Sequence, residues 1–181
     1  MPSQLVISLK YIIHIINILS EWTGRLIAWL VLILVLIIVY NSSMAALFSI
    51  GSVALQELQW HLFALIFLLG AAYTLKHDEH VRVDIIYQGR WMDKRRRAWV
   101  DLLGGLFLLI PFCLLIISAS WTFVHDAYIF QEGSSDAGGL PFRFLLKSAI
   151  PVGFGLLMLQ AIANSLSSFL YLAGVEQEEL D

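Results

Sequence analysis

Residues 26–56 have the sequence LIAWLVLILVLIIVYNSSMAALFSIGSVALQ, which contains no Asp, Glu, Lys or Arg. An α-helix rises about 1.5 Å per residue, so about 20 residues cross the roughly 30 Å hydrocarbon layer of a bilayer. Residues 102–125 and 148–175 are also free of these four residue types, and residues 58–75 form a fourth such stretch at the short end of the range. The sequence therefore predicts four membrane-spanning helices.

The composition agrees with a membrane protein. Of the 181 residues, 59% are hydrophobic and 14% are charged, whereas ordinary globular chains have roughly 45–50% and about 25%. This excess of apolar side chains excludes a soluble enzyme, a nucleic-acid-binding protein and an intrinsically disordered chain. We predict an all-α integral membrane protein, not an enzyme and without a cofactor, with spans at about residues 24–46, 58–76, 98–124 and 146–172.

The basic residues predict how the chain is oriented. The connection between the second and third spans carries seven of them: Lys76, Arg82, Arg90, Lys94, Arg95, Arg96 and Arg97. The first connection carries none. Because short loops rich in Lys and Arg stay in the cytoplasm, we place this connection and both termini there. The last four of these residues open the third helix, where the helix dipole disfavours cations, so we assign them to anionic lipid headgroups.

The first part of the chain has a helical polar stripe. Its members are spaced by three or four residues: Lys10, His14, Asn17 and Glu21. This pattern is typical of an amphipathic helix, and we predict that residues 1–21 form one on the cytoplasmic membrane surface. The membrane domain then spans residues 22–175, and residues 176–181 form an acidic cytoplasmic tail. Alternatively the first helix extends the first span, since Gly24 is the only break available between them.

Ionisable side chains are missing from the middle of the first, third and fourth predicted spans. Intramembrane ionisable groups mark proton relays, ion pathways and substrate sites. The sequence shows no such site, so we expect an accessory subunit rather than a complete transporter.

The histidines leave a second class of function open. His61 and His125 fall near the outer ends of two spans, and His pairs across a four-helix bundle can ligate haem, which would make the chain a redox subunit. His77 and His80 flank two acidic residues, but the further ligands of a closed metal site are missing. The same spans would also suit a self-contained small exporter or a structural membrane protein of unknown association.

Small and polar residues share one face of the predicted fourth helix. They recur at multiples of three to four: Gly153, Gln160, Asn164 and Ser167. Such faces let helices approach closely and form hydrogen bonds in lipid. This face contacts either the other helices of the chain or a partner protein, and the spacing does not choose between the two.

Short sequence words resemble a known family. They are residues 70–75 (GAAYTL), 80–84 (HVRVD), 95–99 (RRRAW), 132–134 (EGS), 140–141 (LP), 146–147 (LK), 150–151 (IP) and 159–160 (LQ). Over about residues 20–172 the chain resembles the small, DctQ-type membrane subunit of tripartite ATP-independent periplasmic (TRAP) transporters. Within that family it is most similar to the branch often labelled mannitol/chloroaromatic type.

The resemblance implies a role inside a three-part secondary transporter of the bacterial inner membrane. A periplasmic substrate-binding protein captures a small organic acid, and a large DctM-type membrane subunit carries the substrate and sodium sites in an elevator mechanism. The small subunit scaffolds and anchors the large one. The partners expected for this chain are therefore these two proteins and membrane lipids, and not nucleic acid.

We expect the contacts with these partners at polar residues near the span ends and on the fourth helix. The expected interface residues are Glu57, His80, Arg82, Asp84, Glu132, Ser134, Arg143, Lys147, Gly153, Gln160 and Asn164. The loop at residues 132–143 carries exposed charges suited to docking a binding protein. Glu132 has an alternative role, in which its carboxylate caps the local turn by accepting from the backbone N–H of Ser134 or Ser135.

Overall fold

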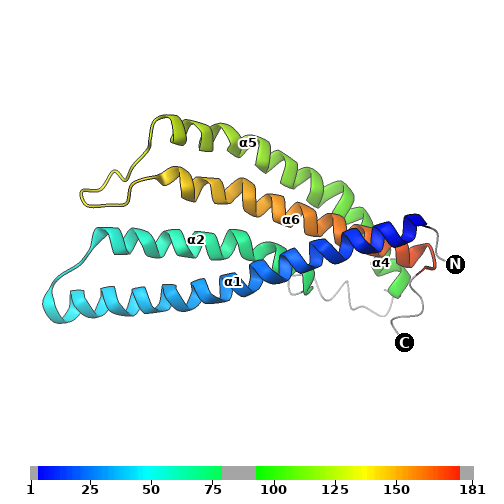
Figure 1. Ribbon diagram of the computed structural model, residues 1–181, viewed down its shortest axis with the longest axis horizontal. Coiled ribbons are helices and arrows are strands. Elements are labelled where there is room, and N and C mark those ends of the chain that lie inside the picture. The colour runs from blue at the N-terminus through cyan, green and yellow to red at the C-terminus, as the bar shows by residue number, and fades with distance from the viewer. Residues whose placement is uncertain (1–3, 79–92, 176–181) are drawn as a thin grey trace.

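The computed structural model describes residues 4–78 and 93–175. In this part of the chain the structure is all-helical, with α1 (Gln4–Phe48), α2 (Val53–Lys76), α4 (Lys94–Gly104), the π-helix η1 (Gly105–Leu109), α5 (Ile110–Ile129) and α6 (Arg143–Leu172) (Figure 1). The elements α4, η1 and α5 follow one another without a break. Four helical segments are long and apolar enough to cross a membrane, which confirms the predicted fold class: Gln4–Phe48, Val53–Lys76, Lys94–Ile129 and Arg143–Leu172.

The four spans run lengthwise beside one another (Figure 1). In the described residues α1 packs against α2, α2 against α6, and α6 against α5, while α1 also crosses α6. Helix α6 is therefore central, and most of its buried residues are small, among them Ala149, Gly153, Ala161 and Ala163. Small side chains let neighbouring helices approach closely in a membrane.

The two ends of the molecule differ in what they carry (Figure 1). The start of α1 and the end of α6 lie at one end, which we call the proximal end. The α1–α2 and α5–α6 connections lie at the other, which we call the distal end. In the described residues the start of α1 and the end of α6 thus lie at the same end, and the predicted placement of both termini in the cytoplasm stays a prediction.

Helix α1 is one continuous helix of 45 residues, so the expected end of a separate helix near residue 21 is wrong as a helix boundary. Gly24 lies within the continuous helix, at a close contact between α1 and α2. A Cβ atom at this position would overlap the ring of Tyr73 on α2, so glycine allows α1 and α2 to pack closely. At about 68 Å, α1 is more than twice as long as the roughly 30 Å hydrocarbon layer of a bilayer is thick. Placement of its first residues at the membrane surface stays a prediction.

The third span contains an irregular turn before Pro111. The π-helix Gly105–Leu109 ends immediately before α5, and Pro111 lies in the first turn of α5. Proline has no backbone N–H and its ring collides with the carbonyl four residues earlier, so a change of helix type at this point relieves the conflict. Gly105 also lies against α6, where a Cβ would overlap the hydroxyl of Ser165.

Candidate functional site

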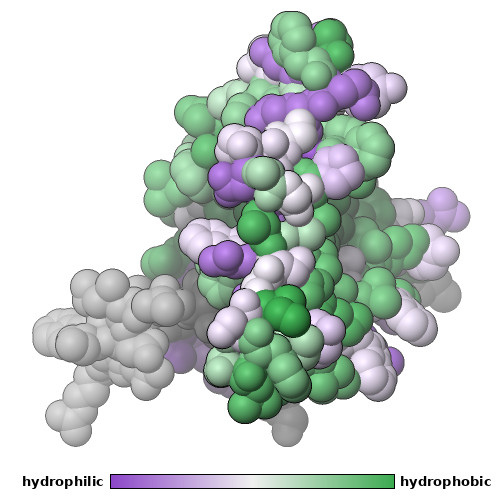
Figure 2. Space-filling view, turned by 90° about the vertical axis from the view of Figure 1, so that its left-hand side faces the viewer, coloured by the Kyte–Doolittle hydropathy of each residue, from purple (hydrophilic) through white to green (hydrophobic). Residues whose placement is uncertain are grey.

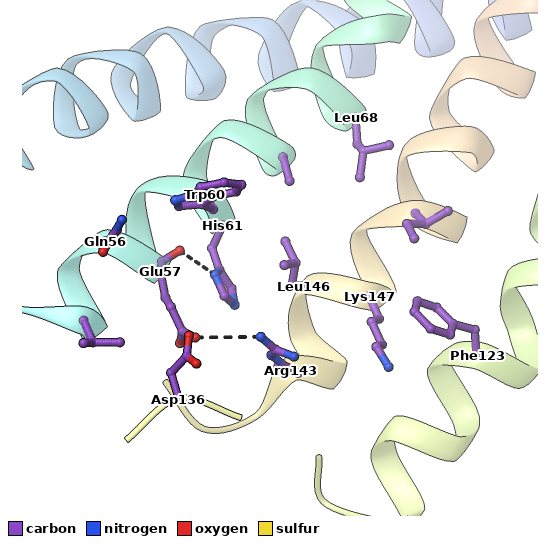
Figure 3. A pocket seen from close by; sticks show the side chains of 13 residues that line it. Gln56, Glu57, Trp60, His61, Leu68, Phe123, Asp136, Arg143, Leu146 and Lys147 are labelled. Atoms are coloured by element: carbon purple, nitrogen blue, oxygen red, sulfur yellow. Dashed lines mark hydrogen bonds and ion pairs between the residues drawn. The ribbon is translucent and has the colours of Figure 1, made fainter. Parts of the chain in front are cut away.

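Charged and polar side chains from α2, α6 and the α5–α6 loop meet at the distal end. We call the following residues the distal cluster: Glu57, Glu132, Ser134, Arg143 and Lys147. Glu57 Oε1 accepts a hydrogen bond from the Ser134 hydroxyl, and Oε2 accepts one from the backbone N–H of Leu140 at 2.6 Å. Arg143 Nη2 lies 3.7 Å from Glu57 Oε1 (Figure 3). The carboxylate of Glu57 therefore fastens the loop to the first turns of α2.

A second ion pair holds the loop to α6. The carboxylate of Glu132 pairs with the ammonium of Lys147, which also lies 3.8 Å from the centroid of the Phe123 ring. The backbone carbonyl of Glu132 accepts from the N–H of Arg143 at 2.9 Å. Cations are unfavourable at a helix N-terminus, and the Glu132 carboxylate offsets the charge of Lys147 there. The N–H of Ser134 donates to Leu140 instead, so the expected cap by Glu132 at Ser134 is wrong.

The distal cluster borders a cavity of about 590 Å³, which is within the range of about 300–1,000 Å³ found for small-molecule sites. Its lining comes from α2, α5, α6 and the loop: Val53, Gln56, Glu57, Trp60, His61, Ala64, Leu68, Phe123, Asp136, Arg143, Leu146, Lys147 and Ile150 (Figure 3). His61 Nδ1 lies 2.7 Å from the Glu57 carbonyl oxygen. A carbonyl oxygen only accepts, so Nδ1 donates and Nε2 of the neutral ring is left as an acceptor.

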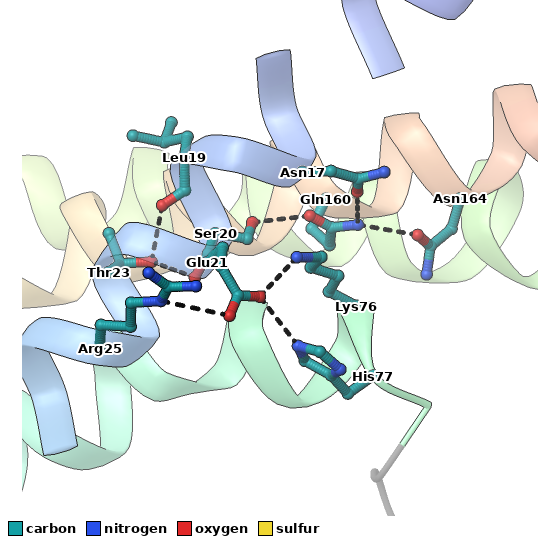
Figure 4. Close-up of polar contacts among 10 residues, drawn as sticks. All are labelled: Asn17, Leu19, Ser20, Glu21, Thr23, Arg25, Lys76, His77, Gln160 and Asn164. Carbon is teal, nitrogen blue, oxygen red and sulfur yellow. Dashed lines mark hydrogen bonds and ion pairs between the residues drawn. The ribbon is translucent and has the colours of Figure 1, made fainter. Parts of the chain in front are cut away.

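A different network lies in the proximal half, between α1, α2 and α6 (Figure 4). At its centre the amide of Gln160 is fully buried. Gln160 Oε1 accepts from the Ser20 hydroxyl at 2.6 Å, and Nε2 donates to Asn17 Oδ1 at 3.0 Å and to Asn164 Oδ1 at 2.9 Å. Asn164 Nδ2 donates to the carbonyl oxygen of Leu75 at 3.2 Å. We call these four side chains the proximal network. They join three helices through neutral groups.

A charged rim lies beside this network. Glu21 Oε2 is 2.6 Å from Lys76 Nζ and 3.1 Å from His77 Nε2, and Glu21 Oε1 is 3.5 Å from Arg25 Nε (Figure 4). Glu21 therefore connects α1 to the end of α2. Two residues of the N-terminal polar stripe therefore make contacts within the chain: Asn17 contacts α6 and Glu21 contacts α2. The spacing of the stripe did not reveal these contacts.

Comparison with known proteins identifies the family. The chain matches the family described as "Tripartite ATP-independent periplasmic transporters, DctQ component" over residues 34–170. The chain belongs to the DctQ family. It is thus a small permease subunit of the TRAP transporter type, as the resemblance implied. No curated protein and no solved structure matches it.

The matched region covers the distal cluster of this DctQ chain completely but only part of the proximal network. It includes α2, α5 and nearly all of α6, but it begins after the α1 residues Asn17, Ser20 and Glu21. The α6 and α2 sides of the proximal contacts therefore lie inside the match, and the α1 side lies outside it.

The structure corrects the expected partner contacts on α6. Gly153 is buried, and a Cβ there would lie 2.7 Å from the backbone oxygen of Leu68 on α2. Gln160 is fully buried, and Asn164 bonds to Gln160 and to α2. This face packs inside the DctQ chain at Gly153 and Gln160, which is the first of the two contacts considered for it; contact of Asn164 with a partner stays a prediction.

The remaining expected site residues are distributed as follows. Five come together in the distal cluster, whereas His80, Arg82 and Asp84 lie outside the described residues. The basic cluster opens α4: Lys94, Arg95, Arg96 and Arg97. Asp93 caps this helix by accepting from the N–H of Lys94 at 2.9 Å, and the first three basic residues are exposed. Their contact with lipid headgroups stays a prediction.

The two histidines considered for haem have separate surroundings. His61 borders the distal cavity, while the side chain of His125 is 57% exposed and lies 3.6 Å from the carboxylate of Asp126. Within residues 4–78 and 93–175, no group of three or more His, Cys, Asp or Glu is placed to hold a metal ion.

Proposed function

We propose that this DctQ chain scaffolds and anchors the large DctM-type subunit of a TRAP transporter. In the proposed complex the large subunit carries out sodium-coupled uptake of a small organic acid delivered by a periplasmic binding protein. The observation that supports this role is that the buried polar groups form hydrogen bonds within the chain. Gln160 bonds to Ser20 and to Asn164, and Asn164 bonds to the backbone of α2, so the hydrogen-bonding capacity of these side chains holds the helices of this chain together.

The shape of the chain also suits a stationary support. The packing order α1, α2, α6, α5 gives a broad arrangement of spans rather than a helix ring around a central path. Large apolar side chains are exposed along it, including Trp29, Leu36, Phe67, Phe107 and Leu115. A broad apolar surface can be shared between lipid and a partner subunit. An elevator transporter needs one fixed part against which another moves, and this chain supplies such a part.

The proposal is tested by deletion and co-purification. The tagged chain, extracted in mild detergent from its own membrane, should retain a large polytopic subunit, and its deletion should abolish binding-protein-dependent uptake. The purified chain alone, in sodium-loaded liposomes, should not transport organic acids. Uptake that survives the deletion would refute the scaffold role. Transport by the chain alone would identify an exporter, and a Soret band would identify a redox subunit.

We place both termini in the cytoplasm, so that the distal end faces the periplasm and the binding protein. The charge distribution supports this orientation, and the exposed loop residues Ser135 and Asp136 are accessible for docking. In a Cys113→Ser background, Ser135→Cys should react with an impermeant maleimide added from the periplasm, and Gln88→Cys should not. The binding protein should slow the labelling of Ser135→Cys. Labelling of Gln88→Cys alone would reverse the orientation, and labelling without protection would exclude docking here.

A further inference from the structure

The cavity at the distal end has a polar rim and an apolar interior, which match the polar headgroup and the apolar acyl chains of a membrane lipid. We propose that it binds one zwitterionic, amine-bearing phospholipid, with the phosphate at Arg143 and one acyl chain between α2 and α6. This inference requires only that the chain spans a membrane. It does not depend on the scaffold role or on the orientation.

The rim offers unused hydrogen-bond donors for the phosphate. The two oxygens of Glu57 already accept from Ser134 and Leu140, and Arg143 Nη2 lies 3.7 Å from Glu57, beyond hydrogen-bond distance. Among the described residues, the guanidinium of Arg143 has an ion-pair partner but no hydrogen bond, and it lines the cavity. A planar guanidinium matches two phosphate oxygens at once.

The charge balance of the rim selects the headgroup. Three carboxylates, on Glu57, Glu132 and Asp136, face two cations, on Arg143 and Lys147. A ligand with a phosphate alone would add a further negative charge, whereas an ammonium beside the phosphate complements Asp136. His61 Nε2 adds an acceptor for the same group. In Figure 3 the side chains of Glu57, Asp136 and Arg143 come together at one side of the cavity.

Below the rim the lining becomes apolar. Ala64 and Leu68 on α2 face Leu146 and Ile150 on α6, with Phe123 of α5 on a third side. Along α2 the distance from Glu57 to Leu68 is about 16 Å, which runs from the helix end into the hydrocarbon depth of a bilayer. A soluble anion would leave this apolar wall uncovered.

The mouth of the cavity has the character of a membrane interface. Trp60 lines it and is 70% exposed, and tryptophan concentrates at the level of lipid headgroups. Figure 2 views the distal end and shows hydrophilic residues gathered between hydrophobic ones. An occupant that enters between α2 and α6 from the bilayer meets the apolar wall and the polar rim together.

The test is lipid retention by the full-length chain, measured by native mass spectrometry. The chain is purified in detergent, stripped of lipid and titrated with dioleoyl phosphatidylethanolamine. Wild type should bind one molecule. Arg143→Gln, which removes the phosphate contact, and Ala64→Phe, which fills the apolar depth without changing the rim, should each weaken binding about tenfold. Arg25→Gln beside the proximal network and Ala28→Phe on the exposed face of α1 are the matched controls and should bind as wild type does.

Helix content and elution volume show that the variants are folded. Dioleoyl phosphatidylglycerol should bind more weakly than the phosphatidylethanolamine, and soluble glycerophosphoethanolamine should not displace the lipid. If Arg143→Gln and Ala64→Phe each retain the phosphatidylethanolamine as strongly as wild type does, the proposal is overturned. Displacement by the soluble headgroup would show an anion site without a lipid chain, and loss of the lipid from the intact transporter complex would show that a partner helix fills the cavity. Either result also overturns it.

Discussion

The two polar regions of this chain differ in the kind of polar group that they use and in how far these groups are buried. The proximal network buries neutral groups: Gln160 is fully buried, and its carbonyl and amide groups bond to three side chains. The distal cluster uses charges, and its members keep some contact with solvent, with 13% of the Glu57 side chain and 15% of the Lys147 side chain exposed. Charged groups are costly inside a bilayer, whereas bonded neutral amides are tolerated. The chemical type of each region therefore follows from how completely neighbouring helices enclose its side chains.

The two regions also hold different parts together. The proximal network joins α1, α2 and α6 directly, whereas the distal cluster holds the α5–α6 loop to the helix ends. Both depend on α6, on which Lys147 and Gln160 are about 20 Å apart along the helix axis. The contact between α6 and α2 at Gly153 lies between them, so a change there is expected to affect both regions.

The largest expected effect is therefore at Gly153. A Cβ there would lie 2.7 Å from the backbone oxygen of Leu68, which cannot rotate away as a side chain does. We expect Gly153→Ala to lower the free energy of unfolding by about 2 kcal/mol, as overpacking of a core does. The measurement is unfolding of the purified chain by sodium dodecyl sulfate in mixed micelles, followed by circular dichroism.

Gly155, on the same helix, is the matched control. A Cβ at Gly155 meets nothing within 4 Å. Because alanine is favoured over glycine in a helix, Gly155→Ala should raise the free energy of unfolding by about 0.5 kcal/mol. If both variants shift stability in the same direction, close packing of α6 on α2 is not what requires glycine at position 153.

A smaller effect is expected in the proximal network. Gln160→Leu removes the partner of Ser20 and Asn17, and we expect a loss of about 1 kcal/mol, since hydrogen bonds between membrane helices contribute modestly. Ser20→Ala, alone and combined with Gln160→Leu, completes a double-mutant cycle in the same unfolding assay. The double variant should lose less than the two single losses added together. Strict additivity would show that the two side chains do not stabilise the bundle as a pair.

The spans could be predicted from the sequence because bilayer thickness sets the minimum length of a spanning helix. A stretch of residues without charges either has this length or is too short. The continuity of α1 could not, because Gly24 is compatible with a helix end and with close packing alike. Only the position of Tyr73 decides between them. The π-helix before Pro111 depends on how a missing N–H is accommodated locally, which composition does not show.

The sequence indicates which polar residues lie near one another only in part. Charges near the span ends indicated Glu57, Arg143 and Lys147, but their pairing depends on the loop conformation. Periodicity placed Gln160 and Asn164 on one face without showing what that face contacts. The stripe containing Asn17 predicts a helix on the membrane surface but does not reveal the contact of Asn17 with Gln160, because a polar stripe facing water and one facing a buried amide have the same spacing.

The smallest effect on the fold is expected at the distal cluster, because Glu57 holds a loop rather than a span. The carboxylate of Glu57 accepts hydrogen bonds from the Ser134 hydroxyl and the Leu140 N–H and attracts Arg143. Glu57→Gln removes its negative charge. We expect the backbone amide of Leu140 to exchange hydrogen several-fold faster while exchange within α2 and α6 stays unchanged. Hydrogen–deuterium exchange with mass spectrometry measures both.

Asp126→Asn is the matched control for this experiment. The side chain of Asp126 is 66% exposed and lies near His125 in the adjacent position, so its loss should leave exchange in the loop unchanged. Backbone bonds also hold the loop, among them those from Ser134 N–H to Leu140 and from Arg143 N–H to Glu132. If Glu57→Gln leaves Leu140 as protected as in wild type, these backbone bonds are sufficient. The partly exposed carboxylate of Glu57 would then contribute to the lipid cavity rather than to holding the loop, and the distal cluster would not stabilise the fold as the proximal network does.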